Sequence, residues 1–466
     1  MILAAAAALA IVVADRTSLR SAAQSGATEL TTLWQGDVLE IRGERAGYLQ
    51  VYNYRRERGG YLRGEAVRPL GLTESDAPGL LAVLRFLRDS RGSEALGISY
   101  GAAYLKSVPS QALTAEPLEA IALMAERLAD TASSTTAAAV DVGAHLDVVN
   151  QFGVHMHSFE RNGRIHVCYD GELFHRVLTL PRASAEDRAI AALSLTRADC
   201  IDPALGLGPR TALDHERSAM LAGIPEGDLT PLTRSRLHAR RATVWASLAF
   251  EAARNGAPVA AAGRSAMTEL LSVRVDDLGE DRRSEYTDTV LRVSASRWAP
   301  AAAAMQPDRY TLSVAPGDPG QTCVALHKPQ AGATALVQRC TYGVPWLASA
   351  QLIAQGEAVV LAVQPLESWR ELWIFHQRNG NWIADVLPPG FNDPEEGYIE
   401  YAGYAPATRR LLIVREVKDR GHFRRSFEEL RLDDLVTVRQ ASSPELLRDF
   451  GRWQDVNWRR DTLALH

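Results

Sequence analysis

The chain is poor in lysine and cysteine, and it carries no excess of positive charge. Three of its 51 basic residues are lysines, and the formal net charge at pH 7 is −5. A nucleic-acid-binding domain usually has a strongly basic balance, so we expect no nucleic-acid partner. With 466 residues, of which 46% are hydrophobic, the chain is long enough for two to four globular domains.

Long apolar runs are absent after the first fifteen residues, so we expect no stable transmembrane span after processing. The first run, residues 2–14, has the length of a signal-peptide core. Val12 and Ala14 supply the small residues needed for cleavage before Asp15, although no Lys or Arg precedes the run. We therefore expect residues 1–14 to be a signal peptide and the mature protein to be periplasmic or secreted. A buried N-terminal helix is the alternative.

The four cysteines are few and even in number. In an oxidising compartment they are expected to form disulfides. Four cysteines allow three connectivities. We favour the one with two local disulfides, Cys168 with Cys200 and Cys323 with Cys340. In a loop-entropy treatment, a disulfide that closes a loop as long as that between Cys323 and Cys340 stabilises the folded protein by about 3 kcal/mol. Without export, the four residues would be buried thiols.

Short apolar groups bounded by glycine occupy residues 30–70 and predict short, tightly turned strands. Gly47 precedes a Tyr-x-x-Val segment at 48–51, and Gly-Tyr-Leu follows at 60–62. These motifs resemble the bacterial SH3-like domains of secreted cell-wall proteins, and Leu19-Arg20 lies where the opening strand of that family would be. The resemblance implies a small SH3-like β-barrel over residues 15–72 that binds peptide, peptidoglycan or a protein partner in the envelope.

Strict alternation places Leu49 and Val51 on one face of the second strand and tyrosines on the other. Tyrosines beside arginines can stack on, and pair with, an extended peptide or an anionic glycan-peptide. Alternatively, the tyrosines pack against the following helices and the arginines form a solvated hairpin tip. The candidate ligand-binding residues are Tyr48, Tyr52, Tyr54, Arg55, Arg56 and Tyr61.

From residue 76 to about 300 the apolar period is mainly helical, which predicts a helical domain. It contains Gly97-Ile98-Ser99-Tyr100-Gly101, which matches the nucleophile-elbow pattern of hydrolases. That pattern requires a buried strand before the serine, and the charged residues 88–94 exclude one. Further on, the spacing of large and small residues over 245–271 resembles one tetratricopeptide-type hairpin, without a second copy.

One β-hairpin, residues 154–170, interrupts the helices. Two alternating segments are joined by Arg161-Asn162-Gly163-Arg164, and Asn-Gly is the strongest two-residue hairpin turn. Pairing outward from that turn sets Phe159 opposite His166, His157 opposite Cys168, and His155 opposite Asp170. The side chains of these pairs then share one face.

Imidazole and carboxylate groups on one small face are ligand types for zinc or copper. The candidate metal ligands are His155, His157, His166 and Asp170, because Cys168 is lost as a ligand when it forms a disulfide. The alternative is a set of histidines on a solvent-facing strand without any cofactor.

Residues 308–466 return to a period of two and predict an all-β domain. Val359–Val363 recurs as Leu411–Arg415, 52 residues later, and repeated meanders of this length resemble propeller blades. The domain is predicted to be either a meander sandwich or an incomplete propeller-like stack. Seven of the nine tryptophans lie at or after Trp298, where a β-domain core is the favoured role and a glycan platform the alternative.

The sequence therefore predicts a multidomain α+β protein with an N-terminal SH3-like barrel, a mainly helical middle and a C-terminal β domain. The favoured function is a non-catalytic, exported envelope scaffold that binds through the SH3-like domain. The alternative is a metal-binding protein or metal-dependent hydrolase that uses the histidine hairpin. A glycan-binding role for the C-terminal tryptophans is a third hypothesis.

Overall fold

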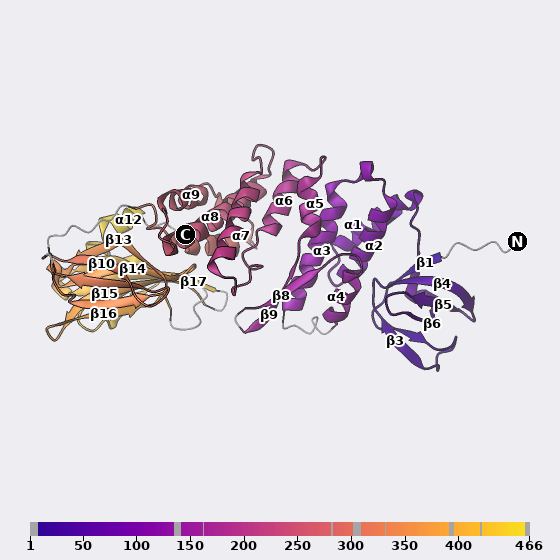
Figure 1. The fold of residues 1–466 in the computed structure, drawn as a ribbon, viewed down its shortest axis with the longest axis horizontal. Helices are drawn as coiled ribbons and strands as arrows, with labels where there is room; N and C mark the ends of the chain where they lie inside the picture. The colour runs from indigo at the N-terminus through magenta and orange to yellow at the C-terminus, as the bar shows by residue number, and fades with distance from the viewer. Residues whose placement is uncertain are drawn as a thin grey trace. The chain divides into compact units, whose positions relative to one another are not determined.

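The structure, a computed structural model, shows an α+β chain with a β region near the N-terminus and a β-rich C-terminal part (Figure 1). The chain divides into two compact units. The first unit comprises residues 1–206 and 224–229, and the second comprises 207–223 and 230–466. The structure describes residues 8–134, 141–161, 163–280, 283–301, 309–330, 332–390, 396–419 and 422–461.

The first unit begins with a seven-stranded antiparallel sheet in the order β3-β2-β6-β5-β4-β1-β7. Alternate side chains of these strands fill a shared core that includes Leu19, Leu39, Val51 and Leu62. Leu49 packs against the same core. This confirms the prediction that Leu49 and Val51 share one face of their strand. The strands are β1 (Ala8–Val12), β2 (Thr17–Arg20), β3 (Glu29–Leu33), β4 (Val38–Arg45), β5 (Tyr48–Asn53), β6 (Arg58–Arg63) and β7 (Val67–Leu70).

Strand β1 lies inside the apolar run that the sequence predicts to be a signal peptide. It pairs with both β4 and β7, and Ala10, Ile11 and Val12 are fully buried. Ala10 and Val12 face the core of the sheet, whereas Ile11 packs against the helices that follow. Cleavage before Asp15 remains a prediction, and a chain cleaved there would lose this strand.

Helices α1–α6 complete the first unit. Helix α2 packs closely on α1 and α3, and a second core of alanine, leucine and valine side chains joins α2–α6. Ser184 caps α6 by accepting a hydrogen bond from the Asp187 backbone N–H, which stabilises the helix start. The helices are α1 (Ala77–Arg88), α2 (Glu94–Ser107), α3 (Ala115–Ser133), α4 (Val142–Asn150), α5 (Glu172–Thr179) and α6 (Ala185–Leu195).

The predicted β-hairpin is present between α4 and α5 as β8 (Met156–Arg161) and β9 (Arg164–Tyr169). Its register places His157 opposite Cys168 and Phe159 opposite His166, as predicted. The Asp170 N–H donates to the His155 carbonyl at 3.1 Å, which continues the same register. Asn162 of the predicted turn lies outside the described residues.

In the second unit, helices α8, α9 and α10 share a core built around Ala242, Ala246 and Leu270. Helices α8 and α9 form the helical hairpin expected over residues 245–271, and its likeness to a tetratricopeptide unit remains a prediction. The predicted helical region 76–300 is thus divided between the two units. The helices before the β strands are α7 (Leu207–Ala222), α8 (Pro231–Arg254), α9 (Ala260–Leu271) and α10 (Arg283–Ala295). Two short helices, α11 (Arg448–Trp453) and α12 (Val456–Asp461), follow the strands, so the prediction that residues 308–466 are all β is wrong at this end.

The rest of the second unit is β-rich, with a three-stranded sheet β10-β11-β12 and an eight-stranded sheet. In the larger sheet, β13–β16 form one antiparallel meander and β17–β20 form another, joined by a short parallel pairing of β15 with β17. The strands are β10 (Thr311–Pro316), β11 (Thr322–His327), β12 (Val337–Thr341), β13 (Val344–Ile353), β14 (Ala358–Leu366), β15 (Trp369–Arg378), β16 (Asn381–Leu387), β17 (Glu396–Ala405), β18 (Arg410–Asp419), β19 (His422–Arg431) and β20 (Thr437–Ala441).

The repeat noted in the sequence corresponds to β14 and β18, the second strands of the two meanders. One face of β14 packs through Val360 onto Ile399 and Ile413 of the second meander. Its other face packs through Leu361 onto the three-stranded sheet. Propeller-like stacking remains a prediction.

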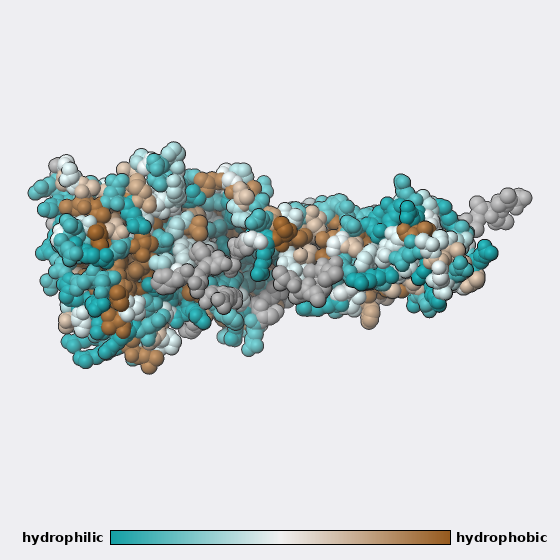
Figure 2. Space-filling view, turned by 90° about the horizontal axis from the view of Figure 1, so that it is seen from below, coloured by the Kyte–Doolittle hydropathy of each residue, from teal (hydrophilic) through white to brown (hydrophobic). Residues whose placement is uncertain are grey.

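Hydrophobic residues form a band on one face of the C-terminal β region (Figure 2). The described tryptophans beyond residue 298 are largely used in packing: Trp346, Trp369, Trp373 and Trp458 are buried. The predicted core role of these tryptophans is thereby confirmed.

No helix among the described residues combines the length and apolar character needed to cross a membrane.

Candidate functional site

Strands β4 and β5 and the turn after β5 carry an aromatic and charged surface formed by Glu40, Arg42, Tyr52 and Tyr54, here called the Tyr52–Tyr54 surface. The Arg42 guanidinium lies 4.0 Å from the centre of the Tyr52 ring, within the range of a cation–π contact. The two tyrosine rings meet edge to face with centroids 5.0 Å apart. Tyr54 is 63% exposed. The surface therefore offers a large aromatic side chain to solvent.

Glu40 holds this surface together. Its Oε2 accepts hydrogen bonds from Arg42 Nε at 2.7 Å and from the Tyr54 hydroxyl at 3.0 Å. The bond from Arg42, followed by that from Tyr54, holds the pKa of Glu40 below its ordinary value. Because both partners bind one ionised carboxylate, the tyrosine and the arginine are positioned before any ligand arrives.

The other two predicted tyrosines lie elsewhere. Tyr48 is buried, and the Arg63 guanidinium lies 5.7 Å from its ring centre. Tyr61 on β6 is half-buried and pairs across the sheet with Gln50. Of the four predicted tyrosines, Tyr52 and Tyr54 are the two in ring contact.

Arg55 and Arg56 have a structural partner. Asp37 is fully buried, and its carboxylate lies 3.4 Å from Arg55 Nη2 and 3.8 Å from Arg56 Nη2. It also accepts a hydrogen bond from the Trp34 N–H at 2.9 Å. The two arginines thus neutralise a buried carboxylate, whereas a solvated hairpin tip would leave them in water.

The four predicted metal ligands do not converge. His155 Nδ1 lies 2.6 Å from Asn150 Oδ1, and the Asp170 carboxylate accepts the Glu172 N–H at the start of α5. His157 is exposed and stacks at 6.1 Å on Phe159. Among the described residues, metal-ligand atoms gather instead at His166, Cys168 and Cys200, all within 4.8 Å of one another.

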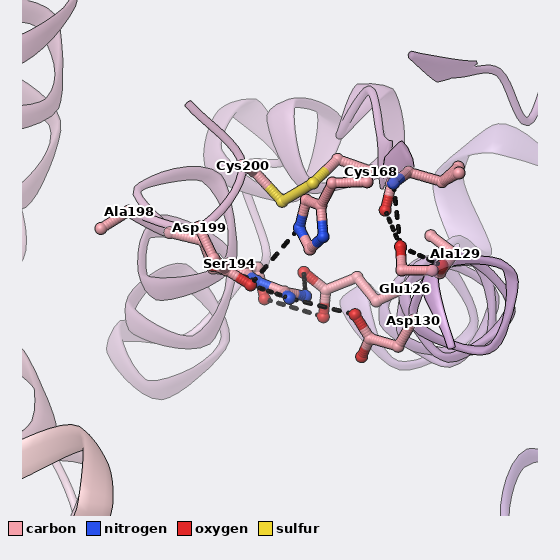
Figure 3. The surroundings of a disulfide bond; sticks show 12 residues. Glu126, Ala129, Asp130, Cys168, Ser194, Ala198, Asp199 and Cys200 are labelled. Carbon is pink, nitrogen blue, oxygen red and sulfur yellow. Dashed lines mark hydrogen bonds and ion pairs between the residues drawn. A yellow bond between two sulfur atoms is a disulfide. The ribbon is translucent and has the colours of Figure 1, made fainter. Parts of the chain in front are cut away.

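Both predicted disulfides are present, Cys168 with Cys200 and Cys323 with Cys340. The first joins β9 to the loop after α6 (Figure 3). The second joins neighbouring strands β11 and β12. Cystine bridges of this kind are typical of proteins from oxidising compartments.

Arg197 organises the charges beside the first disulfide. It pairs with Asp199 at 2.6 Å, with Asp130 at 3.1 Å and with Glu126 at 3.7 Å. Asp199 precedes Cys200, and Figure 3 shows Glu126 and Asp130 on the neighbouring helix. Burial raises the pKa of Glu126, although Arg197 opposes that shift.

His166 lies between this charge cluster and the disulfide. Its Nε2 is 4.0 Å from Asp199 Oδ2, is shielded from solvent and has no hydrogen-bond partner. Burial lowers the pKa of His166; Arg161 and Arg197 lower it further, while Asp199 opposes them. Burial therefore favours the neutral form of the ring, which is the form that binds metal ions.

Ser99 of the elbow-like motif lies in the middle of α2 and is 1% exposed. Its hydroxyl donates to the Ala95 and Gly36 carbonyls at 2.8 and 3.0 Å. A helical, buried serine with its hydroxyl engaged is a packing residue, as the charged sequence before it predicts.

Sequence reasoning missed Glu40 and Arg42 as parts of the N-terminal surface. Glu40 pairs with Tyr52 across β4 and β5, but the register shifts between Ile41 and Gly43. An alternation pattern contains no signal for such a bulge, so the partners of Tyr52 could not be identified from it.

Comparisons of the chain with protein family models, with curated proteins and with solved structures give no match. The function is therefore inferred from the residues and contacts described above.

Proposed function

We propose that the protein is an exported, non-catalytic binding protein of the cell envelope that recognises a peptide-containing ligand through its N-terminal β domain, which resembles SH3-like domains. The observation that carries this proposal is the Tyr52–Tyr54 surface, where an exposed tyrosine and an arginine are held by one carboxylate. The two disulfides support the oxidising compartment that export would provide.

The chemistry of this surface suits an extended peptide that carries a carboxylate. Tyrosine rings supply rigid contact area at low entropic cost, and a guanidinium binds carboxylates with directional hydrogen bonds. The stem peptides of peptidoglycan have both features, as do the termini of partner proteins. Peptidoglycan is the ligand we propose to test first.

The binding experiment uses purified peptidoglycan sacculi and the full chain. Tyr54→Ala is expected to weaken co-sedimentation at least tenfold, because truncation of a central aromatic anchor commonly costs about 2 kcal/mol or more. Tyr342→Ala is the matched control, since Tyr342 is a similarly exposed tyrosine, at 58%, in the second unit. It is expected to bind as the unaltered chain does.

Equal binding by the Tyr54→Ala, Tyr342→Ala and unaltered proteins would rule out recognition through this surface. Absence of any binding to sacculi would rule out peptidoglycan as the ligand. Crosslinking in envelope extracts, compared between Tyr54→Ala and Tyr342→Ala, then tests a protein partner.

A further inference from the structure

We infer that His166, Cys168 and Cys200 form a redox-controlled metal site that takes one zinc ion when the Cys168–Cys200 disulfide is reduced. The observation is that one imidazole nitrogen and two sulfurs lie within 4.8 Å of one another. Histidine nitrogen and cysteine thiolate are preferred zinc ligands. This inference does not depend on ligand binding by the Tyr52–Tyr54 surface.

The site differs from the one predicted by the hairpin pattern. Cross-strand pairing placed His157 opposite Cys168, yet His157 is exposed and stacked on Phe159. The convergent ligand comes from outside the hairpin: Cys200 lies on the loop after α6, 32 residues beyond its partner. That distance in sequence explains why periodicity could not identify it as a ligand.

Reduction requires an external dithiol. Cys168 is 2% exposed whereas Cys200 is half-buried, so the reductant's thiolate is expected to attack Sγ of Cys200. The sulfur–sulfur bond breaks and Cys168 leaves as a thiolate that takes a proton. The reductant's second thiol then resolves the mixed disulfide, which frees Cys200 as a thiol and leaves the reductant as a cyclic disulfide. Two electrons and two protons are transferred in total.

Zinc then replaces the two thiol protons. Around a tetrahedral ion with Zn–S bonds of ~2.3 Å the sulfurs separate to roughly 3.8 Å. Cys200 lies in a segment of turns and bends between α6 and α7, where a small backbone shift can provide this separation. Three protein ligands leave the fourth position for water, as in other zinc sites with an open position.

The surroundings favour a metal-bound imidazole. His166 Nε2 is buried without a hydrogen-bond partner, and the Asp199 carboxylate lies 4.0 Å from it. A carboxylate beside the second ring nitrogen of a ligating histidine, the one that does not bind the metal, orients the ring and raises its basicity. Asp199 is therefore assigned as a positioning residue, held by its ion pair with Arg197.

The second disulfide provides an internal control. Among the described residues, Cys323 and Cys340 have no histidine or carboxylate ligand atom at the distances found around His166. Zinc binding is measured on full-length Cys323→Ser/Cys340→Ser protein, so that bound metal reports on the first pair alone. The protein is prepared oxidised and dithiol-reduced, freed of reductant without oxygen, incubated with Zn²⁺ and analysed for metal after gel filtration.

We expect one zinc per reduced chain and none per oxidised chain. With Co²⁺ in place of zinc, thiolate-to-cobalt absorption should appear in the reduced protein only. Adding His166→Ala should weaken zinc binding more than tenfold, whereas adding His157→Ala on the same hairpin should leave it unchanged. Circular dichroism of every reduced protein, and disulfide content before reduction, verify that the variants fold.

Three results would each overturn the inference. One is a folded, reduced chain that retains no stoichiometric zinc. Another is equal zinc binding by oxidised and reduced chains, and the third is a His166→Ala variant that binds as tightly as its parent.

Discussion

Arg297 and Glu400 form a buried ion pair in the second unit, with Nε 2.7 Å from Oε1 and side chains only 7% and 3% exposed. Arg370 also donates to Glu400, and Trp458 Nε1 donates to it at 3.0 Å. Although burial opposes ionisation, Arg297 and Arg370 hold the pKa of Glu400 below its ordinary value. One carboxylate thus balances two buried cations where β15, β17 and the end of α10 meet.

Glu400→Gln is expected to lower the free energy of unfolding by about 3–5 kcal/mol, because it leaves two buried guanidinium groups without their counter-charge. Glu357→Gln is the matched control. Its 2.7 Å pair with Arg409 has side chains 52% and 46% exposed, so its loss should cost less than about 1 kcal/mol. Denaturant unfolding measures the free energy of unfolding of both variants. Equal losses would contradict the expectation that the buried ion pair contributes more to stability than the exposed one.

Because of Glu119 on α3, we expect the stability of the first unit to depend on pH. Burial, with Asp187, Glu116 and Glu186 nearby, raises the pKa of Glu119 from 4.5 to about 7. The folded chain therefore binds more protons than the unfolded chain between these values, and stability falls as pH rises through that window. Glu119→Gln removes this loss. It should stabilise the protein by about 1 kcal/mol near pH 8, after allowance for solvent screening, and much less near pH 4.

Thermal unfolding of the full chain at both pH values tests this prediction. The control is Glu65→Gln. The Glu65 side chain is 78% exposed, so this substitution should leave the melting temperature unchanged at either pH. A Glu119→Gln variant that is destabilised near pH 8 would show that the carboxylate is needed in its charged form.

The buried Asp37 carboxylate has two arginine partners. We therefore expect substitutions of Arg55 and Arg56 to have non-additive effects on the free energy of unfolding. Arg55→Ala or Arg56→Ala alone leaves one cation beside the buried Asp37, so each should cost about 1 kcal/mol. The double variant leaves the carboxylate uncompensated and should cost about 3 kcal/mol or more. Replacing Asp37 with Asn should abolish the coupling in a double-mutant cycle. Additive costs, with sacculus binding lost in the single variants, would assign the arginines to the ligand.

The elements that the sequence predicts best are those determined by local rules. The hairpin register follows from a two-residue turn between alternating segments, and His157 does lie opposite Cys168. The two disulfides join cysteines that are near each other in the chain, which shortens the loop each must close.

Charge partners could not be predicted because they depend on tertiary folding. Glu400 meets Arg297 from more than a hundred positions away, and nothing in either neighbourhood indicates the contact. The apolar run at the N-terminus is a different case. A strand buried on both faces, such as β1, has no alternation and resembles the core of a leader in composition.

The glycines of the elbow-like motif have a packing role that gives the last prediction. A Cβ at Gly101 would lie 2.4 Å from Ile121 Cγ1, and one at Gly97 would lie 2.4 Å from Met124 Sδ. Both glycines therefore let α2 approach α3 closely. Gly101→Ala should destabilise the first unit by about 1–3 kcal/mol, because Ile121 belongs to the fully packed core.

Gly79→Ala on α1 is the matched control, since a Cβ there meets nothing within 4 Å. It should be neutral or stabilise the unit by up to about 1 kcal/mol, because alanine loses less conformational entropy than glycine on entering a helix. Denaturant unfolding followed by circular dichroism compares the two. Equal effects would show that α2 and α3 can separate to admit a methyl group. Opposite signs would establish that the Gly-x-Ser-x-Gly pattern of this chain serves helix packing, which accounts for its presence without a nucleophile.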